Sequence, residues 1–176
     1  MHKFKNIIVH RFEPKHIFYL LFLLVLPIFH FKLFLLSAII VLDMMYLRLR
    51  LTLGHDIPFD FHFLGMFINS YFGGIVYGLI FLAYAFVARL ALGLQSPAHF
   101  SKQPIFVLFC IAASFFHSIE FTLLGICLYI LRYVSEYLFS FVFTGTISLE
   151  RIGFRLSNIA TAVVAYMLIG NVLALF

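Results

Sequence analysis

Long apolar runs separated by short polar clusters extend along the chain from Ile17 to Phe176. A helix of about 20 apolar residues crosses the roughly 30 Å hydrocarbon core of a bilayer, and several of these runs are longer than that. Proline, glycine and polar residues inside the long runs predict breaks between shorter helices. We therefore expect helices near residues 15–29, 32–48, 60–71, 74–92, 104–117, 119–144 and 152–174.

The first apolar run, from Ile17 to Leu47, has two interpretations. The sequence PIFHFK at residues 27–32 favours a break between two short helices. One kinked, tilted helix would instead lower the number of membrane segments from seven to six and turn the N-terminus to the other side. Either way we expect a single integral membrane domain, residues 1–176, with an all-α, polytopic transmembrane helix bundle of six or seven short segments. In the favoured interpretation residues 1–15 form a basic cytoplasmic or interfacial N-terminus.

Basic residues gather at alternate breaks of the pattern, and the positive-inside rule places such breaks in the cytoplasm. Beyond the N-terminus they are Arg48, Arg50, Lys102, Arg151 and Arg155. Hydrophobic residues make up 64% of the chain and charged residues 11%, well below the roughly 25% charged residues typical of soluble domains. These features predict a multi-pass protein of the cell membrane, with an organellar inner membrane as the alternative, whose partners include membrane lipids. No nucleic-acid-binding motif accompanies the net charge of +5, so we expect no nucleic-acid partner.

Residues 57–86, IPFDFHFLGMFINSYFGGIVYGLIFLAYAF, place Pro58 and Asp60 before a short helix, a glycine turn and two glycines four residues apart. This pattern resembles the substrate-binding (S) components of energy-coupling-factor transporters. The size of the chain and the sequence RIGFRLSNIATAVVAYML at residues 151–168 are similar to the rod-shape membrane protein MreD. The first resemblance implies the substrate-capture subunit of a small-molecule transporter. The second implies a non-catalytic structural or accessory subunit that works with other membrane subunits.

Two rows of small residues at four-residue spacing predict close helix–helix contacts, with a ligand or lipid groove as the alternative. The first row is Gly74 and Gly78, and the second is Ser157, Thr161 and Ala165.

Ionisable residues inside apolar runs are costly in a membrane, so each is expected to face protein or a wet cavity. Arg132 and Glu136 are four residues apart and can pair on one helix face, while Asp43 can pair with Arg89 or Arg132 across helices. These groups either hold the bundle together or line a polar path.

Two irregular turns, at residues 72–74 and 117–120, are predicted on the non-cytoplasmic side and expose backbone groups that need a partner. We expect a small-molecule site between them, with short hairpins in the headgroup layer as the alternative. The polar contacts of this site would come from Asn69, Ser70, Tyr71, His117 and Glu120.

The densest polar cluster is formed by His55, Asp56, Asp60 and His62, residue types that can bind a divalent metal. The simpler interpretation is a loop whose aspartates cap the next helix, and we favour it. The chain lacks a nucleophile motif, a phosphate-binding loop and a dinucleotide fingerprint. We therefore expect no metal, no cofactor and no enzymatic activity.

Overall fold

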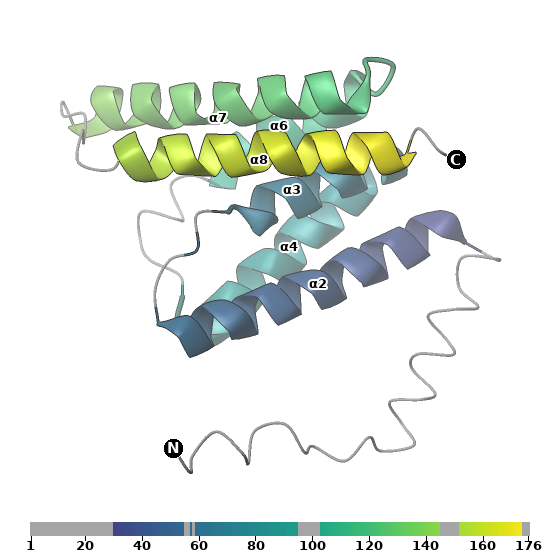
Figure 1. Ribbon diagram of the computed structural model, residues 1–176, viewed down its shortest axis with the longest axis horizontal. Coiled ribbons are helices and arrows are strands. Elements are labelled where there is room, and N and C mark those ends of the chain that lie inside the picture. Colours follow the sequence, from purple (N-terminus) through teal and green to yellow (C-terminus); the bar gives the residue numbers. More distant parts are fainter. Residues whose placement is uncertain (1–29, 55–56, 58, 95–102, 145–151, 174–176) are drawn as a thin grey trace, which may run out of the picture.

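The computed structural model of the chain describes residues 30–54, 57, 59–94, 103–144 and 152–173 (Figure 1). The described residues form helices and no strand, as the all-α prediction requires. The predicted helix near 15–29 and the N-terminal segment 1–15 lie outside the described residues. The remaining predicted helices agree with the structure to within a few residues. Their bounds are α2 Phe31–Leu53, α3 Phe61–Ile68, the π-helix η1 Asn69–Gly73, α4 Ile75–Ala91, α6 Gln103–Phe115, α7 Phe121–Thr144 and α8 Ile152–Leu173.

Successive helices run in opposite directions, so the bundle has two ends (Figure 1). At the first end, on the left of Figure 1, α2, α4 and α7 finish while α3, α6 and α8 begin; we call it the Asp60 end. The other end contains the turn between η1 and α4, and we call it the Gly74 end. Helices α7 and α8 lie side by side, and the short α3 lies in the middle of the bundle.

Helix α3 is buried all round because it is apolar all round. Seven of its eight residues are buried, and its aromatic rings pack against α6, α7 and α8. The ring centroids of Phe63 and Tyr129 are 5.3 Å apart, and those of Phe67 and Tyr166 are also 5.3 Å apart, both pairs in edge-to-face geometry. The core is therefore an aromatic cluster built around α3.

The turn from η1 into α4 depends on Gly74, whose φ of +92° is unfavourable for a residue with a side chain. At the break the carbonyl of Ser70 accepts from the backbone N–H of Gly74 at 3.0 Å. Side chains of neighbouring helices also donate to carbonyls of η1: Ser114 Oγ to that of Ser70 at 3.2 Å, and Lys32 Nζ to that of Gly73 at 3.3 Å. The protein itself thus supplies partners for the carbonyls of Ser70 and Gly73 at the break.

Helix α2 begins directly after His30, whose extended backbone (φ −158°, ψ 83°) is not helical. This start agrees with the predicted break at residues 27–32. The helix continues to Leu53, beyond its predicted end at 48, because Gly54 supplies the left-handed C-cap with φ +69°. Arg48 and Arg50 therefore lie on the last turns of a helix and not in a loop.

Two of the described helices are long and apolar enough to cross a membrane: α7 over Phe121–Val142, with mean hydropathy 1.3, and α8 over Ile152–Val172, with mean hydropathy 1.6. Helices α4 and α6 are apolar but shorter. In the apolar stretch of α7, 44% is buried inside the protein, compared with 17% of the apolar stretch of α8. Helix α8 thus presents most of its apolar surface outward.

Candidate functional site

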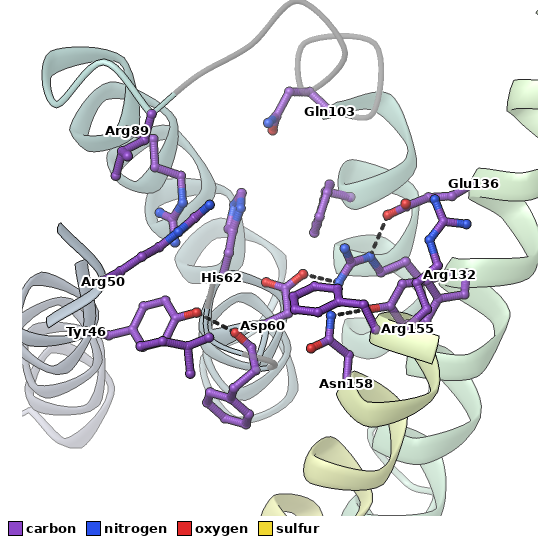
Figure 2. A pocket seen from close by; sticks show the side chains of 16 residues that line it. Tyr46, Arg50, Asp60, His62, Arg89, Gln103, Arg132, Glu136, Arg155 and Asn158 are labelled. Atoms are coloured by element: carbon purple, nitrogen blue, oxygen red, sulfur yellow. Dashed lines mark hydrogen bonds and ion pairs between the residues drawn. The ribbon is translucent and has the colours of Figure 1, made fainter. Parts of the chain in front are cut away.

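A cavity of about 210 Å³ opens at the Asp60 end of the bundle (Figure 2). Its wall combines aromatic side chains with an unusual number of charged ones. One arginine comes from each of four helices: Arg50 from α2, Arg89 from α4, Arg132 from α7 and Arg155 from α8. The other polar residues of the wall are Tyr46, Asp60, His62, Gln103, Tyr133, Glu136 and Asn158.

Arg132 lies at the centre of this wall, between two carboxylates (Figure 2). Its Nε donates to Glu136 Oε1 at 2.8 Å, one helical turn away, and its Nη1 donates to Asp60 Oδ2 at the start of α3. The side chains of Arg132 and Glu136 are almost completely buried. A buried charge is tolerated only when it is paired and hydrogen-bonded, and Arg132 meets both conditions. The predicted pair of Arg132 with Glu136 is therefore present.

Aromatic rings surround the guanidinium of Arg132 on its remaining sides. The centroids of Phe106, Tyr133, Phe63 and Tyr129 lie 4.9, 5.0, 5.3 and 5.7 Å from its central carbon. Cations within about 6 Å of a ring face are attracted by the ring quadrupole. This aromatic shell fixes the guanidinium in place and keeps its charge at the cavity wall.

Asp60 has two roles at this end of the bundle. Its Oδ1 accepts from the backbone N–H of Phe63 at 3.1 Å and so caps the N-terminus of α3, as the sequence predicts. Its other oxygen pairs with Arg132 on α7, 72 residues away in the chain. One carboxylate therefore joins the buried α3 to a surface helix.

Arg89 is held by Asp43, which is fully buried on the inner face of α2. The guanidinium donates to both carboxylate oxygens, at 2.9 and 3.2 Å, and also to the carbonyl of Ala85 at 3.2 Å. Of the two partners that the sequence allows for Asp43, the structure selects Arg89. This bidentate pair fixes Arg89 on the opposite side of His62 from Arg132 (Figure 2).

Rings position the segment that leads into α3. Tyr46 Oη donates to the carbonyl of Phe59 at 2.5 Å, and its ring stacks on that of Phe61. The imidazole of His62 lies flat on Phe106, with ring centroids 4.7 Å apart and an interplanar angle of 10°. The cavity wall is thus rigid on the α3 side.

Two polar residues of α8, Arg155 and Asn158, also line the wall. The guanidinium of Arg155 lies 4.1 Å from the ring centroid of Tyr137 and 5.8 Å from that of Tyr133. The amide of Asn158 donates to Tyr133 Oη at 3.0 Å. Sequence reasoning counted Arg155 only as a basic residue at a break between helices and did not place Asn158 in a site. Their spacing of three residues is the signal that could have placed both side chains on the same face of the helix.

The predicted ligand site at the Gly74 end is organised differently. Asn69 and Ser70 are buried and bond back into their own helix, with Asn69 Nδ2 donating to the carbonyl of Gly65 and Ser70 Oγ to that of Met66. Tyr71 Oη donates to the carbonyl of Ile119 at 2.8 Å, so the two turns do lie together.

The other two predicted residues of that site, His117 and Glu120, are exposed. Glu120 caps α7, and hydrogen bonds from the Thr122 side chain and from the backbone N–H groups of Leu123 and Thr122 lower its pKa below the usual range. Ligand binding by the five residues stays a prediction. Its argument from free backbone groups does not apply to the carbonyls of Ser70 and Gly73, because both have partners within the protein.

The two glycines of the first row of small residues have different roles. Gly78 lies at a close contact, where an added Cβ would be 2.0 Å from Ser70 Oγ and 2.5 Å from Cys110 Sγ. Gly74 has open space at that position and acts as the turn residue instead.

The row of Ser157, Thr161 and Ala165 is displaced from the helix contact that we expected. Ser157 and Thr161 are exposed, and the buried row of α8, one residue further along the chain, is Asn158, Ala162 and Tyr166. Either row fits the four-residue spacing, so the spacing alone does not fix the rotation of the helix.

The structure describes only two of the four residues of the predicted metal cluster, and these two have other roles. His55 and Asp56 lie outside the described residues, while Asp60 caps α3 and His62 stacks on Phe106. Within the described part of the chain, no group of three or more His, Cys, Asp or Glu side chains is arranged to hold a metal ion.

Comparison of the chain with protein-family models, with curated proteins and with solved structures finds no match.

Proposed function

We propose that this chain is a multi-pass membrane protein that binds a small anionic solute in the cavity at the Asp60 end, as the substrate-capture subunit of a transporter. The observation that carries the proposal is the convergence of Arg50, Arg89, Arg132 and Arg155, each from a different helix, on one cavity. Charged residues placed within apolar helices are expensive in a membrane and mark the paths and sites of substrates.

The composition of the wall favours an anion. Among the described residues, the four arginines of the wall are accompanied by three carboxylates, Asp60 and Glu136 on the wall and Asp43 bound to Arg89, which leaves an excess of positive charge. Arginine is well suited to bind carboxylate and phosphate groups, because its planar fork can donate two parallel hydrogen bonds. Aromatic rings surround Arg132, and a less polar environment strengthens such interactions.

The size of the cavity favours a small solute. Its volume of about 210 Å³ is much larger than the ~10–15 Å³ that one water molecule requires. It is smaller than the roughly 300–1,000 Å³ of sites that hold drug-sized molecules. An inorganic or short organic anion fits this range.

Calorimetric titration of the purified protein with chloride, acetate, sulfate and phosphate tests the proposal. Arg155→Gln should weaken the binding of the preferred anion by about tenfold, since it removes a charge-assisted hydrogen bond. The matched control is Arg48→Gln, which removes the same charge from an exposed side chain outside the cavity wall and should leave binding unchanged. Failure of every anion to bind, or equal effects of the two variants, would contradict the proposal.

The outward apolar surface of α8 supports a second candidate, a non-catalytic structural subunit of a larger membrane assembly. Only 17% of the candidate span of α8 is buried, so most of that surface is open to a neighbouring subunit or to lipid. Native mass spectrometry after mild extraction separates the two candidates. A stoichiometric membrane complex whose cavity binds no anion would favour the structural subunit.

A further inference from the structure

Asp60 occupies one of the anion-binding positions of the cavity itself (Figure 2). Its Oδ2 accepts a hydrogen bond from Arg132 Nη1, and Glu136 Oε1 accepts one from Arg132 Nε. Aromatic rings surround the same guanidinium. A solute anion that enters the cavity therefore competes with these two carboxylates for the charge of Arg132.

Of the two carboxylates, Asp60 is the one that can give way. Its side chain is 20% exposed, compared with 3% for Glu136, and both residues line the cavity. Glu136 is four residues from Arg132 on the same helix, so the helix itself holds that pair together. Asp60 reaches Arg132 from another helix. Displacement of Asp60 thus leaves the pair within α7 in place.

The charges of the wall limit how much negative charge the cavity can hold. With His62 neutral, four arginines and three carboxylates leave an excess of one positive charge among the described residues. Binding of a dianion turns this excess into a net negative charge. A carboxylate that has lost its cation in a poorly hydrated site is then stabilised by taking up a proton, because desolvation disfavours its charged form.

The two oxygens of Asp60 have different partners, which suits this uptake. Oδ1 caps α3 by accepting from the backbone N–H of Phe63 at 3.1 Å, whereas Oδ2 faces Arg132. A proton on Oδ2 leaves Oδ1 as an acceptor, so the neutral acid retains the cap.

We propose that the cavity binds its anion together with a proton, and that Asp60 Oδ2 holds that proton. In this step the hydrogen bond from Arg132 to Asp60 breaks, the anion accepts it instead, and an O–H bond forms on Asp60 with a proton from solvent. The inference rests on the proposed function and names the ion that is coupled to the same site.

The surroundings of Asp60 contain one other candidate for the proton. Helix α6 contributes Gln103 and Phe106 to the wall, and neither titrates. The charged and titratable groups that share the cavity with Asp60 or act on it electrostatically are Tyr46 and Arg50 of α2, His62 of α3, Arg89 of α4, Tyr129, Arg132, Tyr133 and Glu136 of α7, and Arg155 and Tyr166 of α8. Histidine is the only type among these that ordinarily titrates between about pH 5 and 8, so His62 is the alternative that the test has to separate.

Calorimetric titration in two buffers of different ionisation enthalpy measures the protons taken up when chloride, acetate, sulfate or phosphate binds. Asp60→Asn imitates the neutral acid and retains a helix cap. At about pH 6 the wild type should take up about one proton more than Asp60→Asn, and its affinity should fall with rising pH by up to about tenfold per pH unit more than that of the variant. The anion is the same for both proteins, so its own titration cancels. Asp60→Ser, which also caps helices, provides a second variant with the same expected result.

His62→Phe keeps an aromatic ring for the stacking on Phe106 and should retain the proton uptake. Loss of the uptake in His62→Phe, together with its retention in Asp60→Asn, would overturn the inference. A wild type that takes up no proton with any bound anion would overturn it as well, without the need for a variant, and would leave the proposed function standing. Absence of all anion binding would instead remove the proposed function itself.

Discussion

Replacement of Arg132 tests the electrostatic design of the cavity wall. Arg132→Met leaves the carboxylates of Asp60 and Glu136 without their shared cation. The side chain of Glu136 is 3% exposed and that of Asp60 is 20% exposed, so Glu136 in particular cannot recover its hydration. Removal of one partner from a buried pair costs about 3–5 kcal/mol, and we expect a loss of this size.

The informative comparison is with a triple variant in which Arg132→Met is combined with Asp60→Asn and Glu136→Gln. All three side chains are then neutral, so the penalty for uncompensated buried charge disappears. The lost contacts between the guanidinium and its aromatic rings are common to both variants and cancel in the comparison. The triple variant should therefore be at least about 2 kcal/mol more stable than Arg132→Met.

Glu136→Gln alone should cost less than Arg132→Met, about 1.5–3 kcal/mol, because Arg132 retains Asp60 as its partner. Unfolding can be followed by circular dichroism during titration of mixed micelles with a denaturing detergent. The reasoning is refuted if the triple variant is no more stable than Arg132→Met. It is equally refuted if Arg132→Met is as stable as the wild type.

Three further predictions concern other parts of the bundle. Gly78→Ala should lower stability by about 1–3 kcal/mol, since its Cβ would overlap Ser70 Oγ, whereas Gly153→Ala, with open space around it, should raise stability by roughly 0.5–1 kcal/mol; equal effects in the same titration would contradict the packing. Asp43→Asn should be strongly destabilising, by about 3–5 kcal/mol, and addition of Arg89→Met should restore part of the loss, as a double-mutant cycle would measure. Glu120 has a lowered pKa in the folded state, so its contribution to stability is present above its unfolded-state pKa and is lost as the pH falls through the folded-state pKa. Thermal melts of Glu120→Gln should lack this part of the acid sensitivity. A pH profile equal to that of the wild type would argue against the cap.

The helix pattern was readable from the sequence because each break carries a local signal. Gly54 and Gly74 adopt positive φ angles, and Glu120 caps the helix that follows it. Such signals act within a few residues, so they are present in the sequence whatever the rest of the chain does. The same locality made the pair of Arg132 and Glu136 predictable from its four-residue spacing.

The sequence did not predict which face of each helix packs against the bundle. Helix α8 has apolar residues on every side, and two rows of residues with four-residue spacing could each form the contact with the bundle. The structure buries the row that contains Asn158 and exposes Thr161. A helix whose apolar residues are spread around its axis carries little information about which face turns inward, so packing decides it.

The sequence by itself determined an all-helical chain, the approximate ends of its described helices and the presence of costly charges within apolar runs. The tertiary structure decided where those charges meet. Asp60 reaches Arg132 across 72 residues, and Arg155 and Asn158 join the same wall from α8. Contacts between distant residues depend on how several helices pack at once, and a single sequence has no local signal for that. The polar cavity, the feature on which the proposed function rests, therefore becomes visible only when the helices are assembled.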